Sequence, residues 1–256
     1  AECNFHVTPE RFAVHWDEHT AGTILASPSN PTGTVISRQV LGELIESSNR
    51  LRGFFIADEI YHGLEYAERS PTALAFSDEV FVVNSFSKYF GMTGWRVGWT
   101  IVPERFVQPA ERLAQNLFLS APSPGQQAAL AALSPECREE LEHRRQMFAE
   151  RRDLLVRGLL DLGFGIPAPP QGALYVYADC SAFADDSHHF AHRLLEQTTF
   201  TQHALSFIET RFVHLLLATK RPNRNLRTLP TLHNRKPFRL LRQIDTMSHR
   251  APPLPR

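Results

Sequence analysis

Polar residues with catalytic potential follow three short apolar runs of this sequence. The apolar runs are TILAS at 23–27, GFFIAD at 53–58 and VFVVNS at 80–85. The polar segments that follow them are SPSNPTG at 27–33, DEIYHG at 58–63 and SFSKYFGMTGWR at 85–96. Lys88 comes shortly after the third run, where burial favours the neutral amine that attacks a carbonyl carbon. We therefore expect Schiff-base chemistry at Lys88.

The three apolar runs have the length and the β-branched and aromatic content of buried strands in an α/β protein. In open α/β sheets, ligands bind outside the carboxyl ends of the strands. We therefore expect the polar segments to meet in one crevice. The candidate site residues are Asn30, Asp58, Tyr61, Ser85, Ser87, Lys88 and Arg96.

A helix is predicted between the first two runs, in SRQVLGELIESSNRLRG at 37–53. Ser37 can cap its start, Val40, Leu41, Leu44 and Ile45 repeat on one face, and Gly53 stands past its end. Strand, helix and strand in this order form a βαβ unit, which predicts parallel pairing of the flanking strands.

Further elements follow along the chain. We expect a strand in WRVGWTIV at 95–102 and a helix opening at Pro103. Residues 135–162 alternate charges with leucines as a long amphipathic helix does, and its charged residues suit a solvated face. GALYVYAD at 172–179 and SHHFAHRLLEQT at 187–198 predict a strand and a helix. These elements divide the chain into a larger domain over 1–133 and a small α/β domain over 134–198.

The last stretch, 199–256, is rich in Arg, His, Thr and Pro and has few acidic residues. We predict a divergent tail there, with no packed fold over its last thirty or so residues. His188, His189 and His192 lie close enough on one predicted helix to suggest a metal site, but a surface helix explains them better, so we predict no metal.

Composition restricts the class of protein. With 43% apolar residues the chain can bury a core, and its 27 basic and 27 acidic residues cancel, so no nucleic acid or membrane partner is indicated. The three cysteines form no CxxC pair, and no apolar run is long enough to cross a bilayer, so we expect a cytoplasmic protein. Because the chain begins without Met, we expect a processed product or a fragment.

The segments SPSNPTG, DEIYHG and SFSKYFGMTGWRVGW occur in an order and spacing that resemble the class I/II pyridoxal-phosphate-dependent aminotransferases of fold type I. The resemblance covers roughly residues 20 to 180 and weakens after about residue 198. It implies a partial aminotransferase large domain, which is a mainly parallel sheet with helices, and a smaller C-terminal α/β domain. It also implies transfer of an amino group between an amino acid and a 2-oxo acid, and a homodimer.

The resemblance assigns a role to each candidate residue. Lys88 would hold pyridoxal phosphate (PLP) as a Schiff base and later move the substrate proton, and Asp58 would keep the pyridine nitrogen protonated. Asn30 and Tyr61 would hydrogen-bond the phenolic oxygen of the cofactor. The remaining residues, which would hold the phosphate, are Ser85, Ser87 and Arg96.

The sequence departs from the family pattern at both ends. Family members carry a glycine-containing phosphate loop and a ring-stacking aromatic residue before the SPSNPTG segment, and we find neither here. Arg211 is the one candidate for the arginine that binds the substrate carboxylate, and its surroundings do not fit. Two alternatives therefore stay open, a PLP-dependent carbon–sulfur β-lyase and a catalytically silent remnant or interaction module.

Overall fold

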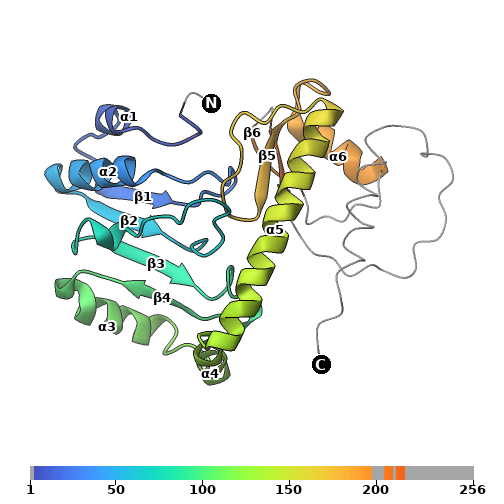
Figure 1. The fold of residues 1–256 in the computed structure, drawn as a ribbon. Coiled ribbons are helices and arrows are strands. Elements are labelled where there is room, and N and C mark those ends of the chain that lie inside the picture. Colours follow the sequence, from blue (N-terminus) through green and yellow to red (C-terminus); the bar gives the residue numbers. More distant parts are fainter. Residues whose placement is uncertain (1–2, 198–204, 210–211, 217–256) are drawn as a thin grey trace. The chain divides into compact units, whose positions relative to one another are not determined.

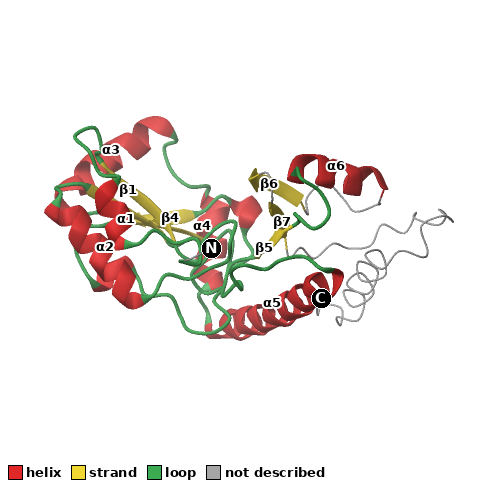
Figure 2. Cartoon of the chain, turned by 90° about the horizontal axis from the view of Figure 1, so that it is seen from above, coloured by secondary structure: helices red, strands yellow, loops and turns green. Residues whose placement is uncertain are grey.

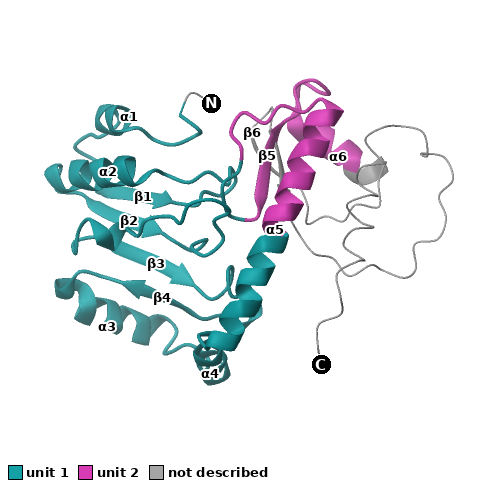
Figure 3. Cartoon of the chain, viewed as in Figure 1, with its two compact units in different colours: residues 1–147, 170–173 teal, residues 148–169, 174–256 magenta. Residues whose placement is uncertain are grey.

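The computed structural model describes residues 3–197, 205–209 and 212–216. They belong to two compact units, one formed by residues 1–147 with 170–173 and the other by residues 148–169 with 174–256 (Figure 3). The predicted division into 1–133, 134–198 and 199–256 differs from these limits and stays a prediction.

The first unit is built on a four-stranded sheet in the order β1 (Gly22–Ala26), β2 (Phe54–Asp58), β3 (Phe81–Ser85) and β4 (Gly98–Ile101) (Figure 1). The first three strands are parallel, and β4 runs antiparallel to β3. The α/β sheet predicted from the apolar runs is therefore confirmed, as is the mainly parallel pairing that the family resemblance implies. Its parallel strands bring the polar segments after β1, β2 and β3 to the same edge of the sheet.

Helix α2 (Arg38–Arg50) joins β1 to β2 and buries Leu41, Leu44 and Ile45 against the sheet. The Ser37 hydroxyl accepts a hydrogen bond from the Val40 amide, as the sequence predicts. The same core contains the fully buried Phe55 of β2. The short helix α1 (Pro9–Val14), which the sequence analysis missed, adds Phe12 to this core.

Helix α3 (Val107–Leu117) lies on the opposite side of the sheet from α2 (Figure 2). A 3-10 turn (Glu104–Phe106) precedes it, and ring centroids of Phe54, Phe81 and Phe106 lie 5.2 to 5.9 Å apart on this face. The predicted helix start at Pro103 is thus wrong by one 3-10 turn, because Pro103 caps that turn instead of α3.

The predicted strand at 95–102 is also shorter than expected. A 3-10 turn (Thr93–Trp95) precedes β4, and Arg96 adopts a left-handed conformation with a φ of 54°. A strand cannot pass through that backbone geometry, so β4 starts only at Gly98.

The later elements include α4 (Ser123–Ala132), which the sequence analysis missed, and the predicted long helix α5 (Pro135–Leu162). In the second unit, β5 (Tyr175–Asp179) pairs with β7 (Phe212–Leu216), which pairs with β6 (Leu205–Glu209), and α6 (Ser187–Gln197) follows β5 in the chain. Two strands thus occur in the first part of the stretch that we predicted as a divergent tail.

Within the part of the chain that the structure describes, no helix combines the length and apolar character needed to span a bilayer. The cytoplasmic location stays a prediction.

Candidate active site

The turn after β3 is organised by the hydroxyl group of Ser85. This oxygen accepts a hydrogen bond from the Ser87 amide at 2.9 Å and lies 2.8 Å from the Ser87 hydroxyl and 3.2 Å from the Val97 carbonyl. Thr93 donates its hydroxyl proton to the Ser87 carbonyl at 2.7 Å. The two serine hydroxyls are therefore held side by side at the carboxyl end of the sheet.

Arg96 reaches the same place from the other end of this loop. Its left-handed backbone is uncommon for a residue with a side chain, and such conformations concentrate at functional sites. One guanidinium nitrogen donates to the Thr93 carbonyl at 3.0 Å, which leaves the other donors of this exposed side chain for a ligand. Gly98 allows the close approach of β3, because a Cβ there would lie 2.8 Å from the Asn84 carbonyl oxygen.

These groups line a pocket of about 410 Å3, which lies in the roughly 300–1,000 Å3 range of small-molecule sites. Two of its described lining residues, Lys88 and Arg96, are positively charged, and none is acidic. A pocket with two cations and paired hydroxyl donors suits a phosphate group. The complete lining is Ile60, Ser85, Ser87, Lys88, Thr93, Arg96, Val97 and Gly98.

Lys88 projects its amine over a buried aromatic ring. The Lys88 Nζ atom lies 5.4 Å from the ring centre of Tyr61, which is only 3% exposed. This contact joins the loop after β3 to the loop after β2. Lys88 is also the only lysine in residues 1–219, since the other two are Lys220 and Lys236.

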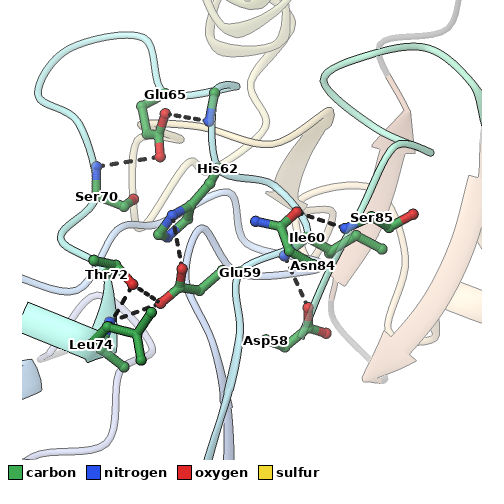
Figure 4. Close-up of polar contacts among 12 residues, drawn as sticks. Asp58, Glu59, Ile60, His62, Glu65, Ser70, Thr72, Leu74, Asn84 and Ser85 are labelled. Carbon is green, nitrogen blue, oxygen red and sulfur yellow. Dashed lines mark hydrogen bonds and ion pairs between the residues drawn. The ribbon is translucent and has the colours of Figure 1, made fainter. Parts of the chain in front are cut away.

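Asp58 ends β2 and lies between β1 and β3, in register with Ala26 and Val83. Its carboxylate accepts a hydrogen bond from the Ile60 amide at 3.1 Å, and Ile60 lines the pocket (Figure 4). Asp58 itself is not among the described residues that form the pocket lining. Asp58 therefore contacts a residue of the pocket lining without being part of that lining.

Asn30 is itself exposed on a partly buried turn after β1, in which the Ser29 amide donates to the Thr34 carbonyl and the Gly33 amide to the Ser29 carbonyl. It too is outside the described pocket lining. The fold therefore brings four of the predicted site residues together in one pocket, with Tyr61 and Asp58 adjoining it. The four residues are Ser85, Ser87, Lys88 and Arg96. A shared site that includes Asn30 stays a prediction.

Residues 170–173 hold the Asn30 turn to the loop after β2, and the sequence analysis missed this role. The amides of Gln171 and Gly172 donate to the Gly33 carbonyl at 2.7 and 2.8 Å, and the Ala173 amide donates to the Leu64 carbonyl at 3.0 Å. A Cβ on Gly172 would lie 2.9 Å from the Leu64 carbonyl oxygen, so the close approach requires glycine.

Two buried carboxylates also escaped the sequence analysis. Glu59, 6% exposed, accepts hydrogen bonds from the Thr72 hydroxyl at 2.9 Å and the Ala73 amide at 2.8 Å (Figure 4). Glu65, 5% exposed, accepts them from the amides of Gly63 and Ser70. Both carboxylates fix the loop that carries Asp58 and Tyr61. The one signal available in the sequence was the position of Glu59 inside the segment DEIYHG.

The remaining candidates lie elsewhere. His188, His189 and His192 are exposed on α6, and in the described ranges no cluster of three or more His, Cys, Asp or Glu side chains is arranged to hold a metal. Arg211 lies outside the described residues.

Comparison with known proteins decides the family. Residues 1–218 match the family model for aminotransferases of class I and II. The chain belongs to this family. The resemblance found in the three polar segments is therefore confirmed at the level of the family. Pyridoxal phosphate is the cofactor of the class I/II aminotransferases.

The relatives of this aminotransferase chain include enzymes with different substrates. A valine–pyruvate aminotransferase of Mycobacterium tuberculosis is 41% identical over 184 residues, which are 71% of this chain and 47% of the relative. An aspartate/prephenate aminotransferase of Thermus thermophilus is 33% identical over 87% of this chain and 58% of its own length. The chain thus spans about half the length of these curated relatives.

Solved structures agree with this assignment. The crystal structure of an aminotransferase from Mycobacterium tuberculosis matches with a TM-score of 0.78 and 36% identity, covering 84% of this chain and 57% of that one. A Thermus thermophilus aspartate aminotransferase variant matches with a TM-score of 0.80 and 28% identity, over 97% and 61%. The partial fold type I large domain expected from the sequence is confirmed.

Proposed function

We propose that this chain binds pyridoxal phosphate through Lys88 and transfers an amino group between an amino acid and a 2-oxo acid. The observation that carries the proposal is the pocket in which Lys88 faces two serine hydroxyls and Arg96 at the carboxyl end of the sheet. Its donor set fits the cofactor, because it offers an amine for the aldehyde and neutral and charged donors for the phosphate.

Each residue has a defined task in this proposal. Lys88 forms the covalent attachment and afterwards carries the proton from the substrate Cα. Ser85, Ser87 and Arg96 bind the phosphate, and Asp58 holds a proton on the pyridine nitrogen. When bound, the cofactor supplies an electron sink for the electrons left at the substrate Cα. Tyr61 and Asn30 would hydrogen-bond the phenolic oxygen, and the position of Tyr61 beside Lys88 supports its part.

The substrates are proposed as a class only. The relatives are named for valine, pyruvate, aspartate and prephenate, so their names favour no single amino acid for this chain. The proposal includes the homodimer expected of the family.

Covalent binding tests the proposal. The purified chain is titrated with PLP, the visible absorbance of the Schiff base is followed, and borohydride reduction with peptide mapping locates the modified residue. We expect modification at Lys88. Addition of an amino acid should bleach the absorbance and yield the matching 2-oxo acid. Pyruvate release from a cysteine-type substrate without bleaching would replace the transaminase assignment by the β-lyase.

Replacing Arg96 tests the phosphate site. We expect Arg96→Gln to weaken PLP binding about tenfold, which corresponds to roughly 1.4 kcal/mol for the loss of a charged donor. The dissociation constant of pyridoxal, which has the aldehyde but no phosphate, should stay unchanged. Equal weakening for both ligands would show that Arg96 does not act on the phosphate.

A further inference from the structure

Tyr89, the residue after Lys88, is held by two contacts of its side chain, one through its hydroxyl group and one through its ring. Its hydroxyl donates to Glu142 Oε1 on α5 at 2.7 Å, across 53 positions of sequence. Its ring covers Gly63, where an added Cβ would lie 2.6 Å from the ring carbons. Gly63 has a φ of 91°, so both its backbone and its lack of a side chain suit this contact.

The attachment on α5 belongs to a network that returns to the loop after β2. Arg145 donates from Nε to Glu142 Oε2 at 2.9 Å and from Nη1 to the Glu65 carbonyl at 3.0 Å. Arg69, at 4.0 Å, also faces Glu142 Oε1, and Arg138 lines the same pocket of about 390 Å3 as Tyr89 and Glu142. Tyr89 is therefore connected to residues 63–65 through its ring and through α5.

This double connection bears directly on Lys88. Tyr61, the ring beneath the Lys88 amine, lies two positions before Gly63, the glycine beneath the Tyr89 ring. The adjacent residues Lys88 and Tyr89 of the loop after β3 thus contact Tyr61 and Gly63 of the loop after β2. Release of Tyr89 would free the backbone next to Lys88 and loosen its amine from Tyr61.

We infer that Tyr89 is a positioning residue for Lys88, held by Gly63 and Glu142 so that the amine stays over the Tyr61 ring in the orientation needed to attack the cofactor aldehyde. The inference rests on the proposed function, because it concerns the reaction of Lys88. A positioned nucleophile reacts faster than a mobile one, and a misplacement of about 1 Å can cost up to a hundredfold in rate.

The hydrogen bond persists over the working pH range. Burial, together with the hydrogen bond to Glu142, raises the pKa of Tyr89 to about 12. Burial acts to raise the pKa of Glu142 as well, but hydrogen bonds from Tyr89 and Arg145 outweigh it and leave this pKa below its usual value of 4.5. Tyr89 stays a donor and Glu142 an ionised acceptor between these limits, where we expect no pH switch.

The raised pKa predicts a loss of stability at alkaline pH. A group whose pKa rises on folding stabilises the fold fully below its unfolded value, here 10.0, and loses that contribution as the pH rises to about 12. We expect the urea midpoint of the wild-type chain to fall more steeply than that of Tyr89→Phe over this window. If the urea midpoints of the two proteins fell in parallel with pH, the raised pKa of Tyr89 would be contradicted.

The positioning role is tested with Tyr89→Phe and Glu142→Ala in the full chain, since an alanine at 142 leaves the Tyr89 hydroxyl without its side-chain acceptor. We expect both to slow covalent attachment of PLP about tenfold, while the affinity for pyridoxine phosphate, which lacks the aldehyde, stays unchanged. The double variant should be no slower than either single one, because both remove the same hydrogen bond. Tyr66→Phe is the matched control, since Tyr66 donates its hydroxyl proton to the Ala173 carbonyl and does not adjoin Lys88.

A second readout does not need the cofactor. Reductive methylation with formaldehyde labels exposed amines, and mass spectrometry reports Lys88 against Lys220 and Lys236 as internal references. We expect Lys88 to label several-fold faster in both variants than in wild type, because formaldehyde is small and needs no fixed direction of approach, so its rate depends on exposure of the amine away from the Tyr61 ring. If wild type fails to attach PLP but the labelling rates differ as stated, the proposed function falls and the positioning of Lys88 by Tyr89 stands. Unchanged attachment and labelling rates in both variants would overturn the inference.

Discussion

Lys88→Ala is expected to abolish covalent attachment of pyridoxal phosphate completely. The reason is chemical, because a Schiff base requires a primary amine and residues 1–219 contain no other lysine. The pocket should still bind the phosphate through Ser85, Ser87 and Arg96, so the cofactor is expected to bind reversibly. The measurement is the near-ultraviolet absorbance of the pyridoxyl group after borohydride reduction and gel filtration, which removes every molecule that is not covalently held.

The chain offers matched controls for this experiment. Lys220→Ala and Lys236→Ala each remove an amine, and neither should reduce the absorbance retained after reduction. A Lys88→Ala protein that keeps stoichiometric label would place the reactive amine elsewhere and refute the proposed site. Alanine substitution of a half-buried surface-loop lysine should leave the unfolding midpoint nearly unchanged, so loss of label cannot be ascribed to loss of fold.

The sheet and the helix between its first strands were predictable because their signals are local. Four buried or half-buried residues of α2 repeat at helical spacing after the Ser37 cap, and the three apolar runs became strands within one residue of the expected limits. Helix α4 was missed because SPGQQAALAA consists mostly of small residues and shows no clear apolar stripe. The start of β4 was misjudged because the left-handed backbone of Arg96 depends on its surroundings.

In the candidate site, too, the local features could be predicted and the long-range contacts could not. Ser85, Ser87, Lys88 and Arg96 lie on one loop, so their proximity follows from a single turn, and parallel strand pairing then places Asp58 beside them. The supports of the site come from distant positions. Glu142 lies 53 residues beyond Tyr89, and residues 170–173 return to Gly33 after the four α-helices α2 to α5. No local pattern marks such pairs.

Glu59→Ala is expected to destabilise the chain by about 3 kcal/mol, the second-largest effect that the structure predicts. The substitution leaves the amide of Ala73, a residue with 0% exposure, without its acceptor, and it removes the partner of the Thr72 hydroxyl. His62 Nδ1 also lies 3.3 Å from Glu59 Oε2 and would lose this neighbour. Urea unfolding followed by circular dichroism at neutral pH measures the loss.

Glu59→Gln separates the hydrogen bonds from the charge. The amide oxygen of glutamine can still accept from Thr72 and Ala73, and its NH2 group can donate to a neutral His62, so we expect a loss of about 1 kcal/mol or less. Because Glu59 stands between Asp58 and the Tyr61 loop, the alanine variant should also attach pyridoxal phosphate more weakly than the glutamine variant. Equal stability of the two variants would mean that these hydrogen bonds do not fix the loop, and the positions of Asp58 and Tyr61 would then depend on the sheet, on Glu65 and on residues 170–173.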